Sequence, residues 1–369
     1  MLSNTNSELR VPGELGMQDF YPANFPDDVP TINLEKISLC KLLNGDKAEA
    51  ERVFNICTTT GFFYLDLLDH ATGRQAWSSA CSIRQLGEDR LNHTPKEEKL
   101  LYKPSGGVSV FDRGYIVRPA AEAGHPDERE FFNIPQSEFF GTKTEGGGLP
   151  PWLSQDAASF KKLLKSGNTI ACTVMSVLEK ELQLPARSLT KLHRLNDDSG
   201  DFVRVLRYAG ASNDDGDGPV GMPAHKDAQS VAILFTWLGG LQIPDPSAEI
   251  HDLNVKSDDW RWVRPEPGYA VVNLGDAMEI FTNQVLKSGI HRVIKAPGQQ
   301  RPYDRYSVLV ATRPENHCLM KALESPLIPV REQRGEIMTS LAWGHSLING
   351  IRKREAEATA NCKSVVTNA

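Results

Sequence analysis

The pattern of apolar residues changes in character a little past the middle of the chain, near Asn196. Before this point, long stretches repeat apolar residues at helical spacing. After it, short apolar runs rich in valine, isoleucine and aromatic residues are separated by polar or Gly/Pro turns, which is typical of strands. The pattern therefore predicts a helix-rich first half followed by a β-rich core.

The first half contains the clearest helical pattern of the chain. From 154 to 184, apolar residues recur at the spacing of one buried helix face. Asp46 followed by Glu49 matches a capping box and predicts the start of another helix. Between 103 and 150 periodicity is weak and glycines are frequent, so we expect an irregular binding loop or lid. Further predicted elements are strands at 31–34 and 62–68 and helices at 75–91 and 96–102.

The second half predicts many short strands with regular spacing, which favours a double-sheet jelly roll or a related barrel. A last helix is predicted from Glu332 to about Ala358. The fold class is thus α+β. We expect one integrated domain, because no low-complexity linker divides it into a helix-rich region 1–200, a jelly-roll core 201–315 and a C-terminal helix and tail 316–369. The strand-like runs lie at 203–209, 230–236, 241–243, 260–263, 269–274, 289–294 and 305–311.

Composition narrows the class of protein further. With 369 residues, 40% apolar and 24% charged, the chain can form a packed core. A net charge of −6 argues against nucleic acid or an anionic membrane surface as a partner. No secretory leader pattern or apolar run of bilayer length is visible, and the six scattered cysteines form no CxxC pair. We expect a cytoplasmic protein with reduced thiols; the sequence does not predict its oligomeric state.

The residues that carry chemistry begin with His225 and Asp227. On a strand, positions i and i+2 face the same way, and His291 follows 66 residues later in another predicted strand. Two imidazoles and one carboxylate suit a facial triad for non-heme Fe(II) with open coordination positions. Either motif alone is more often an ordinary surface or core feature. Their order, followed by an Arg-x-Ser motif, favours the metal site.

Arg305 and Ser307 supply a second feature of this candidate site. They alternate on one predicted strand, so their side chains face the same side. A guanidinium and a hydroxyl together can bind a carboxylate through charge-assisted hydrogen bonds. Because Arg305 follows His291 by only 14 residues, we expect it on the neighbouring strand, within reach of the metal.

Several segments together are similar to one known family. They are VPTINL and GFFYL near the N-terminus, TPKEEKLLY, HKD, GGLQI, the stretch from Trp260 to Val293, and RYSVLVA. The chain resembles the Fe(II)/2-oxoglutarate-dependent dioxygenases, in the subgroup similar to isopenicillin N synthase and the plant flavonoid and gibberellin oxidases. The resemblance covers most of the chain. It implies a distorted double-stranded β-helix, or jelly roll, wrapped by helices.

The resemblance also implies roles for individual residues. His225, Asp227 and His291 match the iron ligands, and Arg305 and Ser307 match the pair that binds the distal carboxylate of 2-oxoglutarate. Tyr208 matches a tyrosine that often adds a hydrogen bond to this co-substrate. At this motif the chain departs from the family, with Leu206 in place of a frequent asparagine and Ala209 in place of the usual proline.

The implied activity is oxidation of a small organic molecule, with O2 and 2-oxoglutarate as co-substrates and ascorbate as an accessory reductant. Hydroxylation, desaturation and oxidative rearrangement all stay open, and a step in secondary-metabolite biosynthesis is the leading hypothesis. Three alternatives remain. They are an oxidase similar to isopenicillin N synthase that needs no 2-oxoglutarate, a non-catalytic jelly-roll binding protein and, less favoured without an HExxH motif, a zinc hydrolase.

The substrate pocket is predicted only coarsely. Phe111, Tyr115 and Phe235 are candidate lining residues, although the first two could equally pack within a lid. Basic residues near these positions suggest a substrate with a carboxylate or phenolate; they are Arg113, Arg118 and Arg207.

Overall fold

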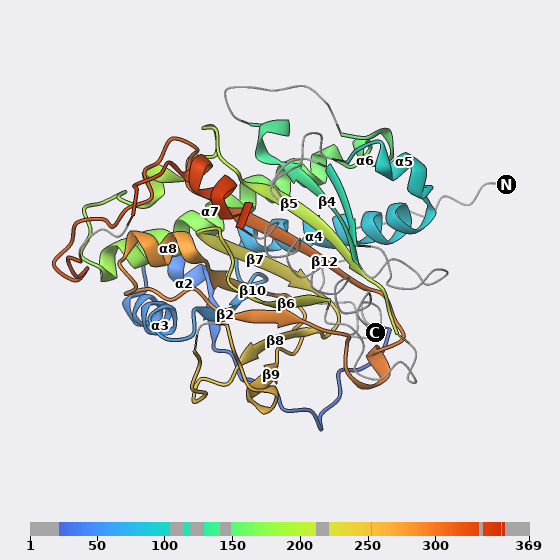
Figure 1. The fold of residues 1–369 in the computed structure, drawn as a ribbon, viewed down its shortest axis with the longest axis horizontal. Helices are drawn as coiled ribbons and strands as arrows, with labels where there is room; N and C mark the ends of the chain where they lie inside the picture. The colour runs from blue at the N-terminus through green and yellow to red at the C-terminus, as the bar shows by residue number, and fades with distance from the viewer. Residues whose placement is uncertain are drawn as a thin grey trace, which may run out of the picture.

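The structure of the protein is a computed structural model. This structure describes residues 22–103, 114–118, 129–140, 149–211, 221–251, 253–331, 335–347 and 349–350. Two β-sheets face each other at its centre, and helices cover the outer face of the larger sheet (Figure 1). This mixed α+β arrangement confirms the predicted fold class.

The large sheet has eight strands in the order β1-β2-β10-β7-β12-β5-β4-β3. Its neighbouring strands are antiparallel, except that β1 and β2 are parallel. The strands are β1 (Lys36–Ser38), β2 (Phe62–Asp66), β3 (Gly114–Arg118), β4 (Arg129–Pro135), β5 (Phe202–Tyr208), β7 (Val231–Thr236), β10 (Tyr269–Leu274) and β12 (Arg305–Thr312).

The small sheet has the order β6-β11-β8-β9. From β5 onward the chain crosses repeatedly between the two sheets, and this winding is that of a double-stranded β-helix. The predicted jelly-roll core is therefore confirmed. The strands of the small sheet are β6 (Met222–His225), β8 (Leu241–Pro244), β9 (Trp260–Trp262) and β11 (His291–Val293).

Alternation along the strands of the large sheet gives it two different faces. The inner face meets the small sheet in a modest apolar cluster formed by residues of both sheets. The outer face joins a much larger apolar core that includes the helices. The inner cluster consists of Leu34, Phe62, Tyr64, Phe131, Leu206, Tyr208, Leu241, Ile243, Val263, Val271 and Val293.

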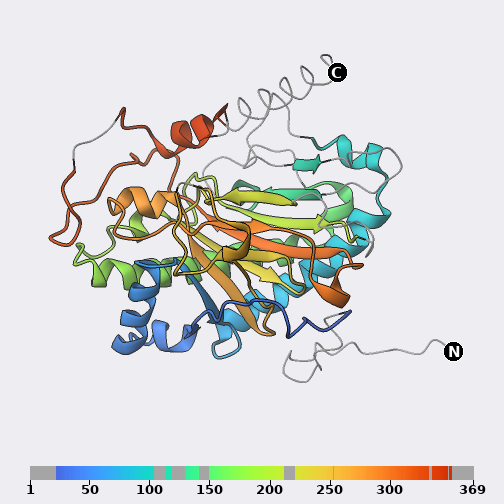
Figure 2. The same ribbon diagram turned by 60° about the horizontal axis from the view of Figure 1, so that its bottom comes forward.

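Two long helices, α4 (Ala71–His93) and α7 (Ala157–Glu181), pack on the outer face. Figure 2 shows them, light blue and green, running along one side of the large sheet. Glycines let both helices approach closely: a Cβ at Gly87 would lie 2.4 Å from Val205, and one at Gly167 would lie 2.7 Å from Val310. Both helices agree with the predicted positions.

The N-terminal elements confirm one prediction and correct another. Helix α3 (Lys47–Cys57) starts where expected, with the Asp46 side chain accepting a hydrogen bond from the Glu49 amide. The Glu49 carboxylate accepts from Ser38 rather than from Asp46, so the capping box is not reciprocal. The strand predicted at 31–34 is wrong, because only Thr31 forms an isolated bridge and β1 begins at Lys36. Helices α2 (Leu39–Leu43) and α5 (Lys96–Leu100) complete this region.

The segment expected to be an irregular loop contains two strands. β3 and β4 pair along their full lengths, and β4 also pairs with β5. The prediction was wrong here because each strand is short and is flanked by sequence without periodicity. As a result, the first 200 residues contribute four strands to the large sheet as well as helices.

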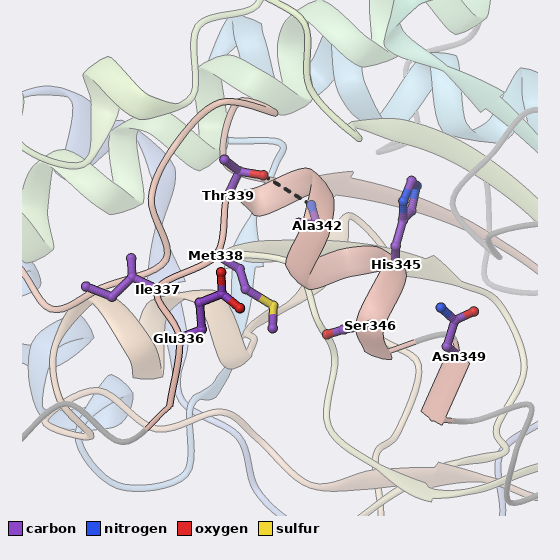
Figure 3. Close-up of a pocket in the computed structure, with 8 residues that line it drawn as sticks. All are labelled: Glu336, Ile337, Met338, Thr339, Ala342, His345, Ser346 and Asn349. Atoms are coloured by element: carbon purple, nitrogen blue, oxygen red, sulfur yellow. Dashed lines mark hydrogen bonds between the residues drawn. The ribbon is translucent and has the colours of Figure 1, made fainter.

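The C-terminal helix begins eight residues later than predicted. Residues 336–338 are not helical, and Met320 donates a hydrogen bond to the Met338 carbonyl. The helix starts at Ser340 because the Thr339 hydroxyl caps it by accepting from the Ala342 amide (Figure 3). Short helices α6 (Pro151–Ser154) and α8 (Asp276–Phe281) are also present. Among the described residues, no helix has the length and apolarity needed to cross a membrane.

Candidate active site

The two histidines and the aspartate predicted as metal ligands meet between the sheets. His225 ends β6 and His291 begins β11, and these two residues are paired in register. Asp227 Oδ1 lies 3.7 Å from His225 Nε2, and Asp227 Oδ2 lies 3.8 Å from His291 Nε2. The three ligand atoms all lie within 4.8 Å of one another, a spacing that one metal ion can bridge.

Asp227 is positioned by a loop rather than by a strand, because β6 ends at His225. The expected strand alternation therefore does not explain its orientation. Its side chain accepts a hydrogen bond from Asn273 Nδ2 at 3.0 Å, and its backbone carbonyl accepts from the Asp276 amide at 2.7 Å. A Cβ at Gly275 would lie 2.5 Å from the same carbonyl oxygen, so this turn needs glycine.

Backbone carbonyls set the orientation of both imidazoles. His225 Nδ1 lies 2.8 Å from the Pro223 carbonyl, and His291 Nδ1 lies 3.2 Å from the Gly289 carbonyl. With Nδ1–H donating to a carbonyl, Nε2 is left as the free ligand atom on each ring. The Phe62 ring packs edge-on against His291 with centroids 5.6 Å apart.

The protonation states also suit a metal. Burial, together with the neighbouring His291, lowers the pKa of His225 to about 4. Burial alone would raise the pKa of Asp227, but the two imidazoles, the Asn273 hydrogen bond and Arg204 bring it below its ordinary value. A neutral imidazole and an ionised carboxylate at pH 7 are the forms that bind metal ions.

Arg305, Ser307 and Tyr208 lie on the large sheet, opposite the histidines. Strand β12 pairs with β5 and β7, not with β11, so the expectation of a strand neighbouring His291 is wrong. The Arg305 guanidinium is buried beside the Tyr208 ring, with Cζ 5.4 Å from the ring centroid. Its Nη1 lies 3.4 Å from Ser307 Oγ. The two side chains thus share one side of the strand, as expected.

Two polar atoms of Arg305 indicate an anion site. Nε and Nη2 are buried and have no hydrogen-bond partner among the described residues. Burial lowers the pKa of Arg305, yet a guanidinium stays charged at neutral pH. Gly240 leaves space for the Arg305 side chain, because a Cβ at position 240 would lie 3.0 Å from Arg305 Cδ. A buried cation with unused donors fits the distal carboxylate of a dicarboxylate such as 2-oxoglutarate.

Comparison with known proteins identifies the family. Residues 200–314, which include the triad and Arg305, match the model of the 2OG-Fe(II) oxygenase superfamily. A 2-oxoglutarate-dependent dioxygenase of Aspergillus fumigatus is 43% identical over 355 residues, which cover 93% of this chain and 92% of the relative. The chain belongs to the 2OG-Fe(II) oxygenase superfamily.

The chain is also similar to a more distant curated protein and to a solved structure. The 2-oxoglutarate-dependent dioxygenase gloE of Glarea lozoyensis is 26% identical, over 82% of this chain and 85% of the relative. The crystal structure of a full-length Neurospora crassa protein in complex with alpha-ketoglutarate (2-oxoglutarate) and 5-formyluracil superposes with a TM-score of 0.68 at 20% identity. This match covers 86% of this chain and 98% of that one, and it shows the shared fold.

Two of the three predicted substrate-pocket residues of the oxygenase lie on the wrong face of the sheet. Tyr115 and Phe235 are fully buried in the helix-covered outer core, where Phe235 packs on Trp77 and the Tyr115 hydroxyl donates to Glu130. Alternation shows which residues share a face but not which face meets the site. Phe111 lies outside the described residues, and we therefore assign none of the three to the pocket.

The prediction that basic residues of this region bind the substrate is also corrected. Arg207 points to the outer face, where it forms ion pairs with Asp304 and Glu130 at 2.7 and 3.0 Å. Arg113 and the Arg118 side chain lie outside the described residues. Two other arginines, Arg129 and Arg204, lie on the inner face instead. The sequence signal that could have found them is their alternation with Phe131 and Tyr208 on adjacent strands.

A further group of possible metal ligands, Glu315, His317 and Cys318, is less suited to an ion. Glu315 is buried, and both of its oxygens already accept hydrogen bonds from Arg194 at 2.7 Å. A shallow hollow formed by residues of the C-terminal segment likewise contains no residue of the triad (Figure 3). The chemistry of the oxygenase is best supported between the two sheets.

Proposed function

We propose that this protein is an Fe(II)- and 2-oxoglutarate-dependent dioxygenase that oxidises a small organic molecule in secondary metabolism. The observation that carries the proposal is the buried Arg305, whose Nε and Nη2 have no described partner, in the same inter-sheet space as a three-ligand cluster. Names of fungal relatives, which include several 2-oxoglutarate-dependent dioxygenases, support it.

In this proposal His225, Asp227 and His291 hold Fe(II). A metal ion held by these residues together with 2-oxoglutarate would supply the activation of O2 that oxidation of an unactivated carbon requires. Asn273 keeps the Asp227 carboxylate oriented through its hydrogen bond to Oδ2. The Pro223 and Gly289 carbonyls keep each Nδ1 protonated, so that Nε2 stays available to the metal.

Arg305 and Ser307 bind the distal carboxylate of 2-oxoglutarate in this assignment. The Arg305 Nε and Nη2 groups would both donate to the carboxylate, which satisfies donors that are otherwise buried without partners. Tyr208 lies beside the guanidinium and contributes the ring wall of this subsite. The apolar cluster between the sheets keeps bulk water from the carboxylate and strengthens its binding.

An anaerobic titration tests this assignment independently of the unknown substrate. Adding 2-oxoglutarate to the Fe(II)-loaded protein should produce the visible charge-transfer band of a chelated 2-oxo acid. The Arg305→Ala variant should bind Fe(II) normally but need at least tenfold more 2-oxoglutarate. Unchanged 2-oxoglutarate affinity in this variant would remove Arg305 from the co-substrate site.

The rival oxidase that needs no 2-oxoglutarate makes a different prediction. With Fe(II), ascorbate and O2, the proposed enzyme converts 2-oxoglutarate to succinate, and a true substrate stimulates this conversion. Substrate oxidation in the complete absence of 2-oxoglutarate would favour the rival. Failure to bind Fe(II) at all would favour the non-catalytic binding protein.

A further inference from the structure

Two arginines on the inner face of the large sheet are not used by the iron or the 2-oxoglutarate assignment. Arg129 is the first residue of β4 and Arg204 the third residue of β5. Alternation places Arg129 on the same face as Phe131, and Arg204 on the same face as Tyr208, both members of the inner cluster. Arg204 is buried and Arg129 is half-buried.

Both guanidinium groups converge on the Phe131 ring. The Cζ atom of Arg204 lies 4.2 Å from the ring centroid, and that of Arg129 lies 6.0 Å from it. Arg204 Nε donates to Asn133 Oδ1 at 2.6 Å. Arg129 Nη1 lies 3.3 Å from the Gly221 carbonyl, and its Nε is buried with no hydrogen-bond partner among the described residues. An unused, buried donor therefore lies beside an aromatic surface.

The two charges act on each other and on the metal ligands. Burial lowers the pKa of Arg204 to about 10, and the nearby Arg129 charge also lowers it. Arg129 likewise contributes to the lowered pKa of His225, and Arg204 to that of Asp227. Two like charges that converge in a poorly solvated space repel one another unless an anion lies between them.

The charges of the proposed catalytic centre already balance without these arginines. Fe(II) with Asp227 retains one positive charge, Arg305 adds another, and the two carboxylates of 2-oxoglutarate neutralise both. Arg129 forms no ion pair with a carboxylate of the described residues. The positive charge of Arg129 thus exceeds what iron and 2-oxoglutarate require, and a negatively charged group of the substrate would balance it.

We propose that the substrate is a small-molecule carboxylate whose charged group is bound by Arg129 and Arg204 over the Phe131 ring. This inference rests on the proposed function, and it names the substrate class of the same site. Guanidinium donors fix the carboxylate at one end. The apolar body of the substrate then packs on Phe131 and Leu206, which hold the carbon to be oxidised toward His225 and Asp227.

Ligand binding to the full chain tests the proposal without turnover. The protein is loaded with Mn(II) and N-oxalylglycine, an unreactive analogue of 2-oxoglutarate that occupies Arg305. A panel of aromatic and aliphatic carboxylic acids is then compared with the matching primary amides, such as cinnamate with cinnamamide and decanoate with decanamide. Thermal shift finds the binders and calorimetry measures their affinities.

Four variants are compared with the unaltered protein. Arg129→Gln and Arg204→Gln each remove one proposed contact. Arg261→Gln is the control that removes the same charge elsewhere. Arg261 lies on β9 of the small sheet and forms an ion pair with Asp245. Arg204→Lys keeps the charge and serves if the buried Arg204→Gln variant loses its cooperative unfolding transition.

We expect acids to bind at least tenfold more tightly than their amides to the unaltered protein. Each glutamine variant should weaken acid binding by about tenfold and bring the acid-to-amide ratio toward one, while the control and Arg204→Lys largely keep the preference. The proposal is overturned if no acid binds, if amides bind equally well, or if both glutamine variants keep the full ratio. A separate assay of the same proteins, loaded with Fe(II) and 2-oxoglutarate in place of Mn(II) and N-oxalylglycine, measures succinate formation. Intact succinate formation with no preference for acids rejects only this inference and leaves the proposed function standing.

Discussion

The two faces of the large sheet are built from the same strands but have different roles. On the outer face, side chains such as Phe235 and Trp237 pack against Trp77 of α4 in a continuous apolar core. On the inner face, a smaller apolar cluster is interrupted by charged and polar groups, among them Arg204 and Arg305. Neighbouring residues of one strand therefore belong to two different environments.

The outer face thus mainly stabilises the fold, whereas the inner face holds the groups proposed to carry the chemistry. Close packing on the helices fixes the strands, because large buried side chains contribute several kcal/mol each. Rigid strands then hold the inner side chains in place, even though burying a guanidinium without a partner opposes folding. The comparison predicts that outer substitutions change mainly stability and inner substitutions change mainly binding and turnover.

The largest effect is expected for the inner ligand His291. In His291→Ala the metal loses one of three ligands, so Fe(II) affinity should fall by more than about 100-fold and succinate formation should reach background. The unfolding temperature of the metal-free protein should change little. Iron analysis after dialysis checks this, with His345→Ala, an exposed histidine, as the matched control. Retained iron in His291→Ala would contradict the assigned ligand set.

The next largest effect separates two neighbours on β7. Phe235 is fully buried on the outer face and Leu234 is half-buried on the inner face. Phe235→Ala should lower the free energy of unfolding by about 3–5 kcal/mol while keeping 2-oxoglutarate conversion per folded molecule. Leu234→Ala should cost less stability. Denaturant unfolding and succinate assays measure both; equal stability losses would mean that the faces are not distinct in packing.

A smaller effect is expected where a polar group supports a ligand. Asn273→Ala removes the hydrogen bond to Asp227 Oδ2, and loss of such a support typically lowers metal affinity by about 10- to 100-fold. Asn168→Ala, on the outer side, removes a hydrogen bond to the His193 carbonyl and should leave Fe(II) affinity unchanged. Competition with a metal chelator measures both variants. Equal Fe(II) affinities would show that Asn273 does not orient the ligand.

Local patterns were sufficient to predict the strands of the core and the residues that meet at the site. Runs such as 269–274 and 305–311 are buried on both faces, so their apolar character is continuous and easily recognised. His225, Asp227, His291, Arg305 and Ser307 could be proposed as site residues because their order along the chain indicates a chemistry that does not depend on exact geometry.

Pairing across long sequence distances could not be predicted in the same way. The sequence does not show that β12 pairs with β5 and β7 instead of β11. Because of this pairing, Arg305 lies on the large sheet and not on the small sheet beside His291. The side assigned to Tyr115 and Phe235 was wrong for the same reason, since a face is defined only by what packs on it. Asn273 and Gly240 support the site through contacts with residues far away in sequence.

The smallest effect concerns a titratable group within the outer region. His193 packs edge-on against Phe281, with Nδ1 against the Leu189 carbonyl and Nε2 near Ser230 Oγ. Burial lowers its pKa to about 4 from an ordinary 6.5. Because the unfolded chain binds the proton more readily, stability is fully present above pH 6.5 and falls as the pH decreases toward 4, by about 2 kcal/mol between pH 7 and 5.

The His193→Gln variant isolates this contribution, because every other titrating group is shared with the unaltered protein. The stability difference between the two metal-free proteins, measured by urea unfolding, should shrink as the pH is lowered from 7 to 5. A difference that stays constant over this range would mean that the His193 ring keeps an ordinary pKa. The outer face would then be more hydrated than its apolar packing implies, and the contrast with the inner face would weaken.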